Sequence, residues 1–166
     1  MRIEVQHDLP LEIEDYWQTL YSSRPFIESL YVDGLGARDL QITAWERGPN
    51  KAFSRVLSFN PRMSAPRAVK KILGDAFRCE EEGHFDPNAG QWHFVYRSSP
   101  LGDKLSISGG QHLSAHPEGC TLHCYLDVAV SIFGVGKLVE KTITTQFKAD
   151  MEAHARFVRR WVARQT

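Results

Sequence analysis

The sequence predicts an α+β fold in which one long C-terminal helix packs across a curved antiparallel sheet of about six to seven strands. Three observations lead to this expectation. Several segments between Leu40 and Val130 alternate apolar and polar residues with a period of two, which is typical of half-buried strands. Two short helical stretches precede them. From Val135 to Ala163 apolar residues recur at spacings of three and four, which is typical of one helical face.

The N-terminal region predicts an edge strand followed by two short helices. Residues 2–7 alternate apolar and polar side chains, as a strand with one buried face does. Asp8, with Pro10 just inside, predicts the start of a helical stretch that continues to Leu20. A second helical piece is expected over residues 25–31.

The central region predicts most of the sheet. Alternating segments bounded by turn residues indicate strands over 40–45, 53–59, 91–98, 104–116 and 120–130. A short helix is expected over 65–74, with proline near its start and glycine at its end. Gly109-Gly110 predicts a bulge or a sharp bend. The acidic run 80–82 is interpreted as a solvated turn or strand end.

The C-terminal region gives the most specific structural signal. Between Val135 and Ala163 there is no proline, and the only glycine is Gly136. A helix of about 28 residues would be roughly 42 Å long, so it needs a wide surface to cover. The side chains on its apolar face are Val139, Ile143, Phe147, Met151, His154, Val158 and Trp161. Of these we expect Ile143, Phe147, Met151 and Val158 to be buried.

Composition indicates an ordinary globular chain. The 166 residues are enough for one domain, 1–166, and 20 basic residues balance 20 acidic ones. This neutrality argues against bulk electrostatic binding, so no nucleic-acid partner is expected. The N-terminus has no apolar signal core, and no apolar run reaches the ~20 residues of a membrane span. A cytoplasmic location is therefore expected, and the oligomeric state stays open.

The three cysteines are interpreted as buried and inert. Cys79, Cys120 and Cys124 are an odd number, which disfavours a disulfide framework. Cys120 and Cys124 share one face of an expected strand, whereas His123 points the other way. That arrangement does not supply the ligand geometry of a zinc site, so no metal is expected.

The order of elements resembles the START-like superfamily, also called helix-grip or SRPBCC, whose members include lipid carriers, hormone receptors and aromatic cyclases. Three local pieces carry the resemblance: residues 5–10 with Tyr16-Trp17 one helix later, residues 65–74, and residues 133–140 leading into the long helix. They look most like small START-like proteins of unassigned function and, more distantly, the VASt sterol-transfer domains.

The resemblance implies a cavity between the concave sheet and the long helix that holds a hydrophobic small molecule, such as a lipid, sterol or polycyclic compound. A bent sheet cannot lie flush against a straight helix, so side chains or a ligand must fill the space. The expected ligand-binding set is Phe53, Arg55, Leu57, Trp92, Phe94, Tyr96, Leu122, Leu126, Ile143, Phe147, Met151 and His154. The alternatives are a cyclase- or hydrolase-type enzyme using the same cavity, or an interaction module with a collapsed cavity.

Each candidate residue also has a simpler interpretation. The aromatic residues suit a flat apolar ligand, but they also suit a filled core. His154 could act as an acid or base, or be a satisfied core residue. Arg55 is expected to anchor a ligand carboxylate, to lie at the sheet edge, or to pair with a glutamate.

No catalytic residue or cofactor is expected. The sequence has no nucleophile–base pair and no complete glycine-rich phosphate or dinucleotide motif. The arginines at 156, 159, 160 and 164 suit transient contact with an anionic membrane, but they also complement the helix dipole.

Overall fold

The computed structural model of the protein describes residues 1–74 and 77–166. One seven-stranded antiparallel sheet runs through it in the order β1-β7-β6-β5-β4-β3-β2. Each strand except β1 therefore lies beside its successor or predecessor in the chain. The strands are β1 (Arg2–Leu9), β2 (Arg38–Arg47), β3 (Phe53–Asn60), β4 (Arg78–Asp86), β5 (Gln91–Ser99), β6 (Leu105–His116) and β7 (Gly119–Val130).

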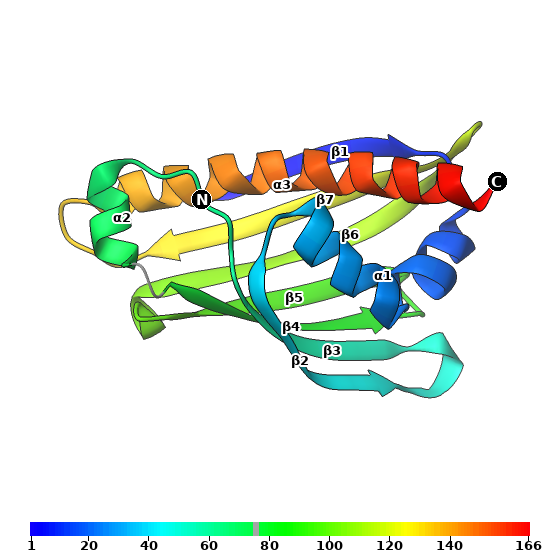
Figure 1. Ribbon diagram of the computed structural model, residues 1–166, viewed down its shortest axis with the longest axis horizontal. Helices are drawn as coiled ribbons and strands as arrows, with labels where there is room; N and C mark the ends of the chain where they lie inside the picture. Colours follow the sequence, from blue (N-terminus) through cyan, green and yellow to red (C-terminus); the bar gives the residue numbers. More distant parts are fainter. Residues whose placement is uncertain (75–76) are drawn as a thin grey trace.

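The long helix α3 (Gly136–Gln165) has 30 residues and crosses one face of the sheet, where it contacts β1 and β7 (Figure 1). The helical turns η1 (Asp15–Tyr21), α1 (Arg24–Ser29) and η2 (Leu30–Gly34) lie beside its C-terminal part, and α2 (Arg67–Leu73) lies near its start. Two single 3-10 turns, η3 (Pro49–Lys51) and η4 (Gly102–Lys104), complete the order. The expected α+β fold is confirmed. Among the described residues no helix is long and apolar enough to cross a membrane.

The face of the sheet toward α3 is built by strict alternation. In β3 the buried positions are Phe53, Arg55, Leu57 and Phe59. In β7, Cys120, Leu122, Cys124, Leu126 and Val128 are buried, while His123 faces the other way, as expected. Because successive side chains point to opposite faces, these residues form one continuous inner surface.

The first helix starts later than the sequence indicated. Asp8 and Leu9 still belong to β1, paired with Thr121 and Cys120, and the helical conformation begins at Ile13. Thr121 Oγ1 donates a 2.6 Å hydrogen bond to the Asp8 carboxylate, so this side chain serves the strand pairing rather than a helix cap. Burial of Leu9 favours the longer strand.

The interpretation of residues 80–82 as a solvated turn or strand end is wrong. They lie inside β4, whose inner positions are Cys79, Glu81, Gly83 and Phe85. Glu80 and Glu82 point outward, whereas Glu81 is 2% exposed. The physical reason is a buried counter-charge from β3, described below.

Gly109 and Gly110 do not mark a bulge, because β6 keeps an unbroken register with both neighbours. A Cβ atom on Gly109 would lie 2.4 Å from the Phe94 ring, and one on Gly110 would lie 2.6 Å from the Tyr125 ring. Both glycines therefore make room for neighbouring aromatic rings.

Candidate functional site

A narrow cleft lies between α3 and the inner face of the sheet. It consists of two adjoining spaces of about 100 Å³ and about 80 Å³. The side chains that line both are Phe59, Pro61, Tyr96, Phe147 and Asp150. The cleft is therefore one continuous feature with an apolar part and a polar part.

The apolar space is formed mainly by hydrophobic side chains from both layers. The remaining residues around it are Met63, Phe77, Cys79, Ile107, Leu126, Ile143 and Gln146. Phe147 was expected to be buried in the core, but it is only half-buried, because the space beside it is not filled. Ile143, Met151 and Val158 are buried as expected.

The polar space contains a buried carboxylate held by three donors. Tyr96 donates a 2.7 Å hydrogen bond to Glu81 Oε2, and Tyr31 donates to the same oxygen. Arg55 Nη2 lies 3.3 Å from Glu81 Oε1. Burial, followed by the charge of Glu81, raises the pKa values of both tyrosines well above their usual value, so they remain neutral donors.

The Arg55 guanidinium is enclosed by aromatic rings. It lies 4.4 Å from the ring centres of Tyr21 and Trp92, and Nη1 donates to the Tyr21 carbonyl oxygen at 3.2 Å. Cation–π contacts strengthen when they are desolvated, so the rings help to hold the charge in the interior. Of the three roles considered for Arg55, pairing with a glutamate is the one observed. Its position at a sheet edge is excluded, because β3 is an inner strand.

A second polar group on the cleft joins Tyr16, Gln111 and His154. The Tyr16 hydroxyl donates to Gln111 Oε1 at 3.2 Å and lies 3.2 Å from His154 Nε2. Since a hydroxyl has one proton, Nε2 of His154 is then the donor in the second contact. Burial, with a further contribution from Arg55, lowers the pKa of His154 to about 3, so the ring is neutral at pH 7.

Asp150 on α3 faces both spaces. Gln146 Nε2 donates a 2.8 Å hydrogen bond to its Oδ1, and Gln146 Oε1 accepts one from the Ser64 backbone N–H at 3.1 Å. Burial raises the pKa of Asp150 to about 6, although the hydrogen bond from Gln146 lowers it. A carboxyl group with this pKa exchanges its proton near neutral pH.

The structure divides the sequence-predicted site into two groups. Phe94, Tyr96, Leu126, Ile143, Phe147, Met151 and His154 line the cleft. Phe53, Arg55, Leu57, Trp92 and Leu122 face the same side but are packed behind it and line neither space. Trp92 is completely buried against Phe53 and Tyr21, so it supports the site from outside.

Sequence reasoning found Tyr96 and His154 but missed six other polar residues of the site. These are Tyr16, Tyr21, Tyr31, Glu81, Gln111 and Asp150. One signal was present for Glu81, because Cys79, Gly83 and Phe85 share its alternation and predict an inward position. For the tyrosines of the short helices no periodic pattern was available, since irregular helical turns set their directions.

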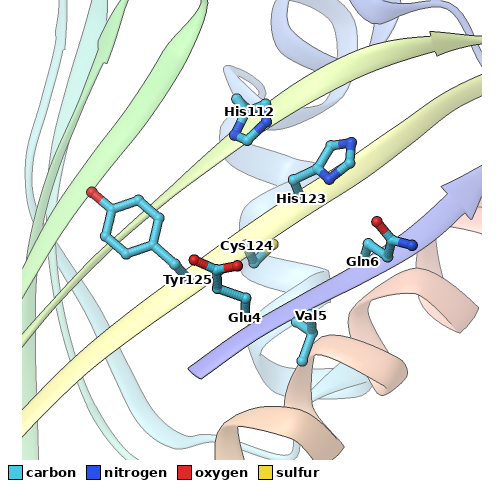
Figure 2. A pocket seen from close by; sticks show the side chains of 7 residues that line it. All are labelled: Glu4, Val5, Gln6, His112, His123, Cys124 and Tyr125. Carbon is cyan, nitrogen blue, oxygen red and sulfur yellow. The ribbon is translucent and has the colours of Figure 1, made fainter. Parts of the chain in front are cut away.

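A separate hollow of about 250 Å³ lies on the outer face of the sheet, away from α3 (Figure 2). Glu4, Gln6 and Tyr125 border it, and the rings of His112 and His123 stack at 4.6 Å above β6 and β7. Within residues 1–74 and 77–166, no group of three or more His, Cys, Asp or Glu side chains is arranged to hold a metal ion. The hollow lies on the outer face of the sheet, whereas the cleft between the sheet and α3 contains the buried Glu81 and His154, so the cleft is the candidate site.

Solved structures with the same architecture include norcoclaurine synthase from Thalictrum flavum in complex with dopamine and hydroxybenzaldehyde. It is 19% identical, has a TM-score of 0.67, and the match covers 100% of this chain and 88% of that one. The di-domain ARO/CYC protein StfQ from the steffimycin biosynthetic pathway is 12% identical, with a TM-score of 0.61 over 98% of this chain and 52% of its own. A protein from Rhodobacter sphaeroides is 13% identical, with a TM-score of 0.61 over 99% and 93%.

These similarities define the class of fold: the chain has the SRPBCC, or helix-grip, fold. The family model described as "Protein of unknown function (DUF2505)" matches residues 4–162, and the chain belongs to that family. No curated protein matches the sequence.

Proposed function

We propose that the protein binds a hydrophobic small molecule in the cleft between the sheet and α3. The observation that carries this proposal is the unfilled space beside Phe147, which is mostly apolar and ends in a few fixed polar groups. Ligand sites commonly combine an apolar lining with a small number of orienting hydrogen-bond groups. The Tyr16–Gln111–His154 cluster would supply that orientation at the inner end.

The dimensions of the cleft favour a slender ligand. Its two spaces, of about 100 Å³ and about 80 Å³, are smaller than the roughly 300–1,000 Å³ of sites for drug-sized molecules. An acyl chain fits such a space by occupying its length. A sterol, as the likeness to VASt domains implies, would require Phe147 to swing out of the cleft. We therefore infer an acyl chain as the ligand class.

Calorimetric titration with octan-1-ol tests this function. Met151→Trp adds bulk where the helix borders the polar space, and it should abolish binding while the chain remains folded. Leu138→Trp is the matched control, because Leu138 lies on the same helix with an exposed side chain, and it should bind octan-1-ol normally. Failure of the wild-type chain to bind octan-1-ol would favour an interaction module with a collapsed cavity.

Enzymatic use of the same cleft is a second candidate, favoured by one observation. His154 and Asp150 both face the cleft, and the pKa of Asp150, raised to about 6, suits proton transfer near neutral pH. Hydrolysis of p-nitrophenyl octanoate tests it. An enzyme should turn over many equivalents and lose this activity in Asp150→Asn while still binding octan-1-ol. If the wild-type chain and Asp150→Asn hydrolyse the ester at the same rate, the cleft has no catalytic role and only the binding function remains.

A further inference from the structure

A second cleft, the basic cleft, adjoins the cavity that the apolar and polar spaces form between α3 and the sheet. It has a volume of about 460 Å³ and is bordered by the cationic side chains of Arg38, Arg62 and Lys70. They come from the start of β2, the segment after β3, and α2, so the fold brings together three separate parts of the chain. Around this cleft the described lining contains no acidic side chain.

In the part of the chain that the structure describes, none of the three cations forms an ion pair with a carboxylate. Arg78 nearby is different, because it donates to Asn60, Ser58 and the Asp39 carbonyl oxygen. Among the described residues, the charges of the basic cleft therefore have no carboxylate partner.

Backbone conformation holds Arg62 at the edge of the cleft. Gly36 has φ of +71°, and a Cβ atom there would lie 3.1 Å from Cδ of Arg62, so the arginine stem lies across the bare glycine backbone. Asp39 on the same segment also has a positive φ, of +53°. Left-handed backbone at non-glycine residues is costly, and it concentrates at functional sites.

The basic cleft and the cavity share their walls. Arg62 borders the polar space of the cavity as well as the basic cleft. Pro61 and Met63 border the basic cleft and the apolar space. A molecule lying in the cavity could consequently place one end beside Arg62, at the edge of the basic cleft.

We propose that the basic cleft binds the acidic head group, a carboxylate or phosphate, of an amphiphile whose acyl chain occupies the cavity. This inference rests on the proposed function. Arginine suits such groups because its planar guanidinium donates two parallel hydrogen bonds to them. A nucleic acid is the weaker fit, since the cleft is concave, continues into an apolar space, and belongs to a chain with no net charge.

Calorimetry with octanoate, octyl phosphate, octan-1-ol and inorganic phosphate tests the proposal. Octanoate or octyl phosphate should bind about tenfold more tightly than octan-1-ol, because one additional charge-assisted hydrogen bond accounts for a difference in affinity of about that size. Arg62→Gln should remove that advantage. Arg38→Gln changes a residue that borders the basic cleft alone, so it should remove the advantage as well and leave the affinity for octan-1-ol unchanged. Arg164→Gln removes the same charge and should change nothing, because Arg164 lies in the last turn of α3 whereas α2 lies near the start of that helix (Figure 1).

Each other outcome has a distinct meaning. If octan-1-ol binds as tightly as both acidic probes, the head-group site is wrong while the cavity function stands. If Arg164→Gln weakens octanoate as much as Arg62→Gln does, the attraction is general and the site is wrong. If inorganic phosphate binds as tightly as octyl phosphate, the cleft is an anion site unconnected to an acyl chain. If no eight-carbon probe binds, the proposed function itself fails, and this inference with it.

Discussion

Replacing Glu81 by glutamine would leave the Arg55 guanidinium buried without its counter-charge. Both side chains are at most 2% exposed and lie 3.3 Å apart. Glutamine keeps a carbonyl oxygen that Tyr31 and Tyr96 can still donate to, so the main loss is the charge. Removing one partner of a buried pair costs about 3–5 kcal/mol, and we expect Glu81→Gln to lower the free energy of unfolding by about 3 kcal/mol.

Urea denaturation of a double-mutant cycle measures this interaction. Arg55→Met in the Glu81→Gln background removes the stranded charge, so the double variant should cost at least ~2 kcal/mol less than the sum of the single changes. Glu82→Gln is the matched control. Its exposed ion pair with Arg97 of β5, at 2.8 Å, lies on the opposite face of the sheet, and its loss should leave stability nearly unchanged. Additive single changes, or an equal effect of Glu82→Gln, would refute the reasoning.

Three further predictions concern groups inside the fold. The folded pKa of Asp150 is raised from 3.8 to about 6, so the free energy of unfolding should fall as pH rises through this range. Asp150→Asn should remove that fall and stabilise the protein at pH 7 by roughly 1–2 kcal/mol. The folded pKa of His154 is instead lowered from 6.5 to about 3, so stability should decline as pH falls through this range, and His154→Gln should flatten that decline in urea titrations. Gly83→Ala would place a Cβ atom 2.0 Å from the Trp92 ring, so thermal denaturation should show a loss of about 3 kcal/mol that Trp92→Phe partly restores.

Periodicity predicted the architecture because the two signals in this chain are strong. The long helix was expected from Val135 to Ala163 and is observed from Gly136 to Gln165. The strand omitted from the expectation, β4, has a charged residue at an inner position, and a pattern of apolar residues alone cannot show that Arg55 neutralises it. Its absence from the expectation reflects a tertiary contact overriding a local pattern.

The site was predicted only in part, for a related reason. Apolar spacing found the side chains of α3 and β5 that line the cleft, including Phe94 and Met151. Whether an inward residue borders the space or packs behind it depends on neighbouring elements. Trp92 is covered by Tyr21 from η1, a turn whose π-helical geometry has no clear sequence signal.

Methyl NMR with the methionines labelled shows where a bound ligand lies in the protein. The chain has three methionines: Met63 and Met151 border the cleft, and Met1 is exposed at the N-terminus. With octan-1-ol bound, we expect intermolecular NOEs from its alkyl protons to the methyl groups of Met63 and Met151, and none to that of Met1. NOEs confined to Met1, or bound octan-1-ol with no NOE to Met151, would contradict a ligand site between the sheet and α3.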